Sequence, residues 1–196
     1  RVVELCDQTG LPFRKVSRLA DRLEHDIGAY ELREVAIEDL LGREPVQFDW
    51  QLVHECFGER SVLITGAGGS IGSELAQQCA RAGVGRLLLL ERHEQSLEEV
   101  TARIRAEFPA LELLPLLADC GDVQSYRALL PDTDFVIHAA ACKQVPMLEE
   151  QLRAALRNNV QATETLALAS RAAGVRNFLL VSTDKAVSPV NVMGAS

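Results

Sequence analysis

Short, almost entirely apolar runs alternate with longer amphipathic stretches from about residue 62 to the end of the chain. Strands covered on both faces of a parallel sheet have this near-continuous hydrophobicity, because neither face meets water. The runs are Val62–Thr65, Leu87–Leu90, Leu113–Leu117, Phe135–His138 and Phe178–Val181. Their alternation with helical stretches predicts an α/β fold with a doubly wound, mostly parallel sheet.

The stretches between the runs carry apolar residues at steps of three and four, which is the spacing of one helix face. Two such stripes follow the first and second runs; they are Ile71, Leu75, Cys79 and Ala82, and then Leu97, Val100, Ile104 and Phe108. A longer helix is predicted from about Gln151 to Ala173, and Gly174 is a typical residue to end it.

Residues 1–57 lack this alternation and cannot form a good core of their own. We interpret them as the tail of a preceding domain and a linker, with a boundary between residues 42 and 60. Residues 58–196 would then be the α/β domain. A helical extension packed against the sheet is an equally good interpretation of the same segment.

The turn between the first strand and the first helix is rich in glycine. Thr65–Gly72 reads T-G-A-G-G-S-I-G, with a G-x-x-G-x-x-G spacing at Gly66, Gly69 and Gly72. Glycine permits a tight turn and a close approach of the backbone to a pyrophosphate, and a helix N-terminus offers free N–H groups. We therefore predict a Rossmann-type domain that binds a dinucleotide here. A glycine-rich turn without a ligand is the alternative.

Acidic residues end the second and third strands. Glu91 lies 19 residues after Gly72 and can accept hydrogen bonds from the adenosine ribose, and it would repel a 2′-phosphate, which favours NAD. Arg92 follows and could hold that phosphate instead, so NADP stays possible. Asp119 could meet the adenine amino group, or it could be a turn residue before Gly121.

Composition narrows the classes of partner. The formal net charge of −8 gives no reason to expect nucleic acid. No apolar run reaches the roughly 18 residues of a membrane span, and no secretory leader is visible, so we expect a cytoplasmic, soluble chain. The cysteines are scattered without a C-x-x-C pair, which argues against disulfides and a metal site; they are Cys6, Cys56, Cys79, Cys120 and Cys142.

Several segments resemble the extended short-chain dehydrogenases/reductases, in their capsular-polysaccharide-biosynthesis branch. Thr65–Gly72 resembles the phosphate loop of that family, and His138–Pro146 is similar to its strand-four motif. Ser182–Ser196 is similar to the signature of the nucleotide-sugar 4,6-dehydratases that act on UDP-N-acetylglucosamine. Ile37–Val46 resembles the linker of the long, membrane-anchored members. The resemblance covers nearly the whole chain.

The resemblance implies roles for individual residues. The loop glycines with Ser70 and Ile71 would bind the cofactor pyrophosphate, and Lys143 would lie near the substrate. Three alanines, Ala139, Ala140 and Ala141, would line the nicotinamide side of the site. Asn159 matches a structural or active-site asparagine of the long helix. Taken alone, these residues are also compatible with close packing, a helix bend and a solvated charge.

Thr183, Asp184 and Lys185 follow the fifth predicted strand directly. A 4,6-dehydratase oxidises C4 of the sugar with NAD, which makes the C5 proton acidic so that water can leave across C5 and C6. We assign Thr183 to the C4 oxygen, Asp184 to the general acid and Lys185 to the C5 base. Asp184 must then stay protonated, which a buried or anionic setting favours, and Lys185 must lose its proton. A polar turn at the strand end is the alternative.

Met193 occupies the position where most short-chain dehydrogenases carry the catalytic Tyr, and long members of this branch are known to carry Met there. A thioether cannot move that proton, so the base for C4 oxidation stays unassigned. The Lys of a Y-x-x-x-K pattern starting here would fall after Ser196. We therefore expect a chain cut before its sugar-binding part and inactive by itself.

The resulting expectation is the cofactor domain of an NAD(P)-dependent nucleotide-sugar 4,6-dehydratase, which is a homo-oligomer when full-length. The linker resemblance would attach the parent protein to the inner membrane, with this domain in the cytoplasm. A nucleotide-sugar epimerase shares every motif up to the sugar site. A non-catalytic dinucleotide-binding module is the alternative from another class, and Met193 supports it.

Overall fold

The computed structural model describes residues 15–16, 32–33 and 49–196. Residues 49–196 form one compact unit, and residues 1–48 form a separate one. The described part of residues 1–48 is a pair of antiparallel strands, β1 (Lys15–Val16) and β2 (Leu32–Arg33). The linker resemblance of Ile37–Val46 and most of the interpretation of residues 1–57 therefore fall outside the described residues.

The unit of residues 49–196 is built on a five-stranded sheet in which all neighbouring strands are parallel. The strands stand in the order β5-β4-β3-β6-β7, so the first strand of the sheet, β3, lies at its centre. Their bounds are Ser61–Thr65 for β3, Arg86–Glu91 for β4, Glu112–Leu117 for β5, Phe135–His138 for β6 and Asn177–Leu180 for β7. Each predicted run lies within one residue of its strand, and the doubly wound Rossmann-type fold is confirmed.

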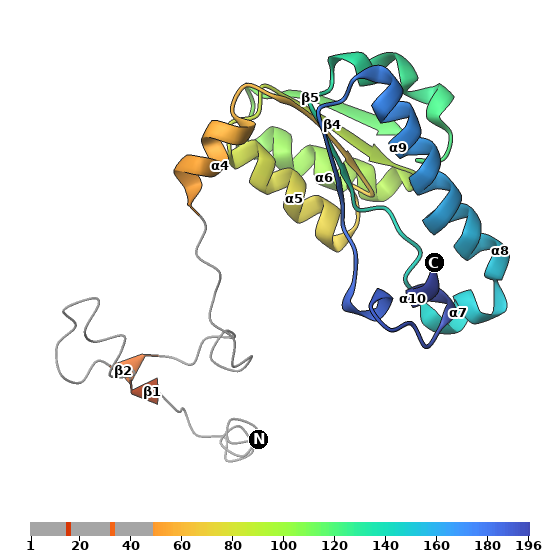
Figure 1. The fold of residues 1–196 in the computed structure, drawn as a ribbon. Coiled ribbons are helices and arrows are strands. Elements are labelled where there is room, and N and C mark those ends of the chain that lie inside the picture. The colour runs from red at the N-terminus through yellow and green to blue at the C-terminus, as the bar shows by residue number, and fades with distance from the viewer. Residues whose placement is uncertain (1–14, 17–31, 34–48) are drawn as a thin grey trace. The chain divides into compact units, whose positions relative to one another are not determined.

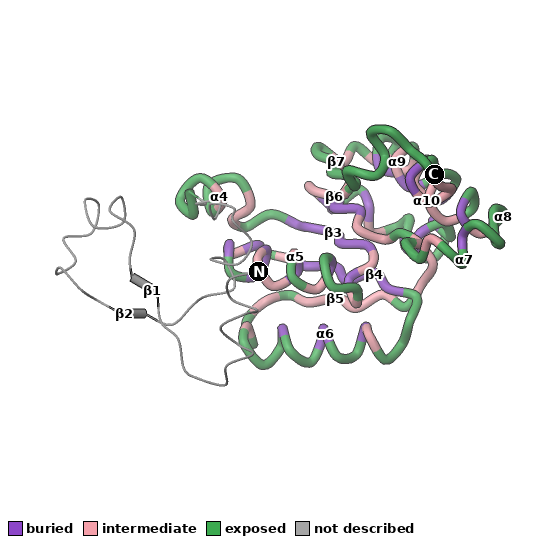
Figure 2. Tube along the Cα trace, turned by 90° about the horizontal axis from the view of Figure 1, so that it is seen from below, coloured by how far each residue is buried: buried purple, intermediate pink, exposed green. Residues whose placement is uncertain are grey.

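Helices cover both faces of the sheet (Figure 1). Helices α5 (Ser70–Arg81) and α6 (Glu94–Glu107) pack on one face, around the buried side chains of Val62, Ile64 and Leu87. Helix α9 (Ala162–Ala173) and the short turns η1 (Val123–Ser125) and η2 (Arg127–Asp132) pack on the other. Within residues 49–196 the central strands are therefore the most buried part, and the outer helix surfaces are exposed (Figure 2).

Helix α4 (Trp50–Phe57) belongs to the unit of residues 49–196, although the sequence interpretation grouped it with the preceding segment. Its Phe57 packs against Phe135 of β6, with 4.7 Å between the ring centroids. His54 Nδ1 lies 2.8 Å from the carbonyl oxygen of Ala82, just after α5. The compact unit therefore begins before residue 58.

The apolar stripe of α6 is confirmed, because Leu97, Val100 and Ile104 are all buried. The stripe of α5 is only partly correct. Cys79 and Ala82 are buried and Leu75 packs against the core, but Ile71 is 56% exposed. Ile71 lies in the first turn of α5, next to the glycine-rich turn that follows β3.

The predicted long helix exists, but it is not uniform. It begins as α8 (Leu152–Ala155), continues as a π-helical segment η3 (Leu156–Gln161) and ends as α9. Gly174 has a φ of 82° and ends α9 in the left-handed conformation, as predicted. Three shorter helices flank it in the chain: α7 (Val145–Glu150), η4 (Asp184–Ala186) and α10 (Val192–Ala195). No helix in the described part of the chain is both long and apolar enough to cross a membrane.

Candidate functional site

A cavity of about 920 Å³ lies at the carboxyl end of the parallel strands. The segments that follow all five strands contribute to its wall. The order of the strands reverses between β3 and β6, and ligands of open α/β sheets bind in the crevice at such a point. The wall includes every residue to which the sequence analysis gave a cofactor, substrate or catalytic role, except Asp184.

The glycine-rich turn is shaped by close contacts that exclude larger side chains. Gly66 has a φ of 65°, and a Cβ there would lie 2.7 Å from the Cα of Ala140. A Cβ on Gly72 would overlap the carbonyl oxygen of Gly66. These two glycines therefore let the start of α5 pack closely on the turn and let the turn pack on the segment after β6.

The start of α5 suits an anionic group. The first N–H groups of a helix have no partner within the helix, and they carry the positive end of its dipole. Ser70 and Ile71 supply such groups and line the cavity. At Gly69 a Cβ would meet only the carbonyl oxygen of Gly66, at 3.2 Å, so the absence of a side chain leaves the approach open. The turn fits the paired phosphates of a dinucleotide.

Glu91 is 7% exposed, and its carboxylate holds the turn against the end of β4. Oε2 accepts a hydrogen bond from the Gly68 N–H at 3.1 Å. Oε1 accepts from the N–H groups of Arg92 and His93 at 2.9 and 3.1 Å. A carboxylate offers about four acceptor positions, so about one remains for a ligand hydroxyl.

Arg92 directly follows β4, and its side chain is part of the cavity wall. Its Nη1 donates to Asn158 Oδ1 at 3.2 Å and lies 3.9 Å from Asp119 Oδ2. Asp119 Oδ1 accepts from the N–H of Gly121 at 2.8 Å, which is the turn contact expected of a strand-end aspartate. Both residues line the cavity while holding its wall together.

Asn159, in the π-helical segment, fixes the chain after β6. Its Oδ1 accepts from the N–H of Cys142 at 2.8 Å, and its Nδ2 donates to the carbonyl oxygen of Cys142 at 3.1 Å. The same Nδ2 donates to Ser196 Oγ at 3.0 Å. The neighbouring Asn158 donates to Cys142 Sγ at 2.9 Å. A π-helical turn carries an extra residue and is frequent at functional sites, and here it points two successive amides at one cysteine.

The residues after β7 are placed less favourably than the sequence analysis required. Thr183 and Lys185 line the cavity, but Asp184 does not. The Thr183 hydroxyl donates to Asp184 Oδ1 at 3.0 Å, and Lys185 Nζ lies 3.5 Å from the same oxygen. This hydrogen bond and the lysine charge lower the pKa of Asp184, which is fully exposed. Without substrate, Asp184 therefore lies ionised in an exposed turn, whereas a general acid must carry a proton.

Two other residues with predicted roles, Lys143 and Met193, also line the cavity. Lys143 is exposed on the cavity wall, and Met193 lines the cavity from α10. The N-terminus of α10 is capped by Asn191 Oδ1, which accepts from the N–H of Gly194 at 2.8 Å. Among the described residues, no group of His, Cys, Asp and Glu side chains is placed to hold a metal ion.

Two buried polar residues behind the cavity wall had no role predicted from the sequence. Thr65 and His138 end the adjacent strands β3 and β6, and they are 0% and 1% exposed. Burial lowers the pKa of His138 to about 4. The available signal was a polar residue ending each of two otherwise apolar runs that a parallel sheet could place side by side.

The parallel sheet and the cavity at its carboxyl end together define a Rossmann-type domain. Residues 62–196 match the model of a family described as polysaccharide biosynthesis protein. The chain belongs to this family, in the capsular-polysaccharide-biosynthesis branch of the extended short-chain dehydrogenases/reductases. It is 35% identical to the capsular polysaccharide biosynthesis protein CapD of Staphylococcus aureus, over 98% of this chain and 33% of that protein. It is 34% identical to the probable polysaccharide biosynthesis protein EpsC of Bacillus subtilis, over 97% of this chain and 32% of that protein.

A solved structure shares the fold. It is a UDP-glucose 4-epimerase from Stenotrophomonas maltophila with bound NAD and formylated UDP-arabinopyranose, and it matches with a TM-score of 0.62 and 24% identity. The match covers 69% of this chain and 45% of that one. The chain spans about a third of the length of the two curated relatives above.

Proposed function

We propose that residues 49–196 are the cofactor domain of an NAD-dependent nucleotide-sugar 4,6-dehydratase of the UDP-N-acetylglucosamine type, acting in the synthesis of a surface polysaccharide. The observation that carries this proposal is the single cavity that brings together the glycine-rich turn, Glu91, and the Thr183 and Lys185 side chains. The first two suit a dinucleotide, and the last two suit a sugar whose C4 and C5 react.

NAD fits this cavity better than NADP. The Glu91 carboxylate is buried at the end of β4, where the adenosine ribose of a bound dinucleotide would lie, and it would repel a 2′-phosphate. Arg92, the cation that could attract that phosphate, is already engaged by Asn158 and Asp119. When bound, NAD would supply a reversible acceptor for the hydrogen removed from C4 of the sugar.

The roles of the residues after β7 are part of the proposal. When substrate binds, the Thr183 hydroxyl would turn from Asp184 Oδ1 to donate to the C4 oxygen, and Lys185 would take the C5 proton. Asp184 can act as the acid for the 6-hydroxyl only if bound substrate covers it, since desolvation and the substrate's own negative charge both favour a protonated carboxyl. Lys143 lines the same cavity and would lie near the substrate, as the family resemblance implies.

The test uses a protein that contains this chain and has the length of its relatives. It is incubated with UDP-N-acetylglucosamine and NAD in deuterated water, and the product is followed by NMR. A 4,6-dehydratase gives a 6-deoxy-4-keto sugar that carries deuterium at C5. A product that keeps its 6-hydroxyl contradicts the proposal.

The second candidate function is a nucleotide-sugar 4-epimerase. The exposed, ionised state of Asp184 favours it, because epimerisation at C4 needs no acid to expel the 6-hydroxyl. The same experiment separates the two reactions. An epimerase inverts C4 and keeps hydrogen at C5, so no deuterium enters that position.

A further inference from the structure

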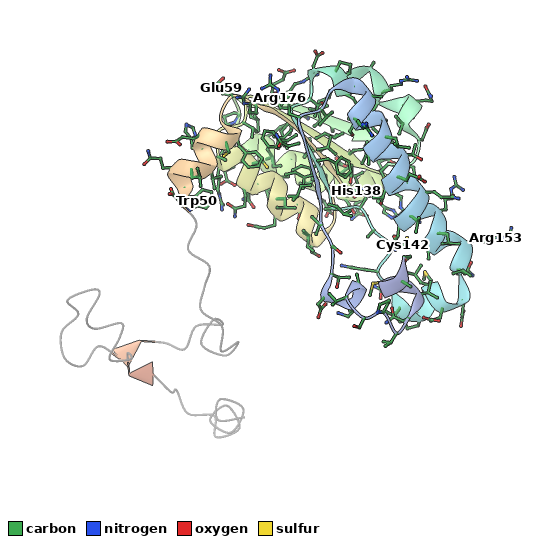
Figure 3. All side chains as sticks on the ribbon, viewed as in Figure 1. Trp50, Glu59, His138, Cys142, Arg153 and Arg176 are labelled. Atoms are coloured by element: carbon green, nitrogen blue, oxygen red, sulfur yellow. The ribbon has the colours of Figure 1, made fainter. Side chains whose placement is uncertain are left out.

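A line of hydrogen bonds joins the sheet to α9, with the buried side chain of His138 at its centre. Figure 3 labels His138. Thr65 Oγ1 lies 2.6 Å from His138 Nδ1, and Thr163 Oγ1 of α9 lies 2.8 Å from His138 Nε2. The line continues at both ends. The N–H of Ala140 donates to Thr65 Oγ1 at 3.3 Å, and the Thr163 hydroxyl donates to the carbonyl oxygen of Asn159 at 2.7 Å.

The directions of these bonds determine which ring nitrogen of His138 carries the proton. A threonine hydroxyl has one hydrogen, and that of Thr163 is given to the carbonyl of Asn159, so Thr163 can only accept from the ring. His138 Nε2 must therefore carry the proton. The neutral ring then presents a bare Nδ1, which accepts the hydrogen of Thr65, and the oxygen of Thr65 stays free to accept from Ala140.

All the bonds in this line consequently point the same way, from Ala140 to Asn159. In the other tautomer, Nδ1 would carry the proton and donate to Thr65. The bare Nε2 would then face the Thr163 hydroxyl, whose hydrogen is already given to the carbonyl of Asn159. Buried hydrogen-bond networks with every member satisfied rigidify their surroundings. None of the members is titratable apart from the imidazole itself, so no neighbouring charge favours a second proton on it.

The line holds the segment of residues 139–142, which forms one wall of the cavity. At its start, Ala139 donates to the Thr65 carbonyl oxygen at 3.2 Å and Ala140 donates to the Thr65 hydroxyl. At its end, Cys142 is held by the side chain of Asn159, whose carbonyl receives the last bond of the line. His138 therefore joins the two anchors of the segment.

We propose that His138 is a positioning residue, which acts as the neutral Nε2–H tautomer to set the distance between the phosphate-binding turn and the segment of residues 139–142. It takes no part in proton transfer to a substrate. The link to ligand binding rests on the proposed NAD site, because the segment packs against Gly66 of the turn. The tautomer itself is independent of that site.

The tautomer is tested by 15N NMR of the imidazole in the 196-residue chain, without cofactor. We expect a protonated Nε2 and a bare Nδ1 at neutral pH. A protonated Nδ1, or a mixture of both forms, would overturn the proposal. Because no ligand is present, this result stands whether or not the chain binds NAD.

A pair of variants tests the positioning role. Thr163→Val removes the acceptor of the Nε2 proton, whereas the control Thr163→Ser keeps the hydroxyl. We expect Thr163→Val to weaken NAD binding about tenfold by calorimetry, which corresponds to about 1.4 kcal/mol, and to populate the Nδ1–H tautomer. Thr163→Ser should keep the wild-type affinity within about twofold.

The outcomes of this comparison are distinct. If Thr163→Val melts at a lower temperature but keeps both the NAD affinity and the tautomer of the wild type, His138 has only a structural role and the proposal is wrong. If wild-type chain shows no NAD binding while its tautomer is Nε2–H, the proposed cofactor site fails and the hydrogen-bond line stands. If Thr163→Val does not fold, Thr65→Ser and Thr65→Val supply the same comparison at the Nδ1 side.

Discussion

The close approach between the phosphate-binding turn and the segment after β6 can be measured by substituting one glycine. Gly66→Ala forces a left-handed φ on an L-residue, which costs about 1–2 kcal/mol. The new Cβ would also lie 2.7 Å from the Cα of Ala140 and 2.8 Å from its nitrogen, both backbone atoms. Overpacking of this kind costs a further 1–3 kcal/mol or so. We expect a loss of about 2–5 kcal/mol in the free energy of unfolding, by the sum of these terms.

Gly174 provides the matched control, since it also has a positive φ but a Cβ there would meet nothing within 4 Å. Gly174→Ala should therefore cost only the backbone strain, about 1–2 kcal/mol, and leave NAD binding unchanged. Urea denaturation of both variants gives the difference, and calorimetry gives the affinities. If Gly66→Ala is no more destabilising than Gly174→Ala, the turn and the segment do not touch as described.

Three further predictions concern charged and titratable groups. Glu91→Gln replaces a carboxylate oxygen that accepts from a backbone N–H by an NH2 group, which cannot accept. The variant should lose about 1–3 kcal/mol in the free energy of unfolding, measured by urea denaturation, and should prefer NAD over NADP less strongly. Unchanged stability would show that the three N–H bonds are not made. The folded pKa of His138, about 4, lies below the value of about 6.5 in the unfolded chain, so stability should fall as pH drops from about 6.5 to 4, by up to about 1.4 kcal/mol per pH unit. His138→Gln should flatten that slope, and equal slopes would contradict the buried neutral ring. Lys185→Ala, in a protein of the relatives' length, should abolish turnover but keep NAD affinity within about twofold; retained turnover would remove Lys185 from the mechanism.

The central strands β3, β4 and β6 could be predicted because they are buried on both faces and are therefore apolar almost throughout. The outer strands β5 and β7 are apolar too, although they are less buried. The stripe of α6 was correct for a similar reason, since Leu97, Val100 and Ile104 face the sheet along the whole helix. Ile71 was misplaced because the apolar spacing marks one face of a helix but does not show which residues on that face are buried. An apolar residue in the first turn of α5 instead lines the cavity.

The cavity wall was largely predicted from motifs, whereas the contacts behind it were not. The bond between Thr65 and His138 joins residues 73 positions apart, and the bond to Thr163 spans 25 positions. Such pairs depend on which strands become neighbours and on the register between them, and no local pattern encodes them. The π-helical segment that directs Asn158 and Asn159 to Cys142 likewise leaves no mark in the apolar spacing.

Asp184 shows that a sequence can predict the position of a carboxyl group without predicting its protonation state. Its position after the fifth strand was correct, but its protonation depends on what covers it, and the turn η4 leaves it exposed beside Thr183 and Lys185. The charge of a carboxyl depends on how far it is buried and on the charges and hydrogen-bond donors around it, which only the folded structure fixes.

The central claim is that the turn from Gly66 to Gly72 binds the paired phosphates of NAD. A crystal structure of the 196-residue chain grown with saturating NAD tests it most directly. We predict phosphate oxygens within hydrogen-bonding distance of the Ser70 and Ile71 N–H groups, with the adenosine ribose beside Glu91. A turn that stays empty, or a dinucleotide bound elsewhere in such crystals, would contradict the claim.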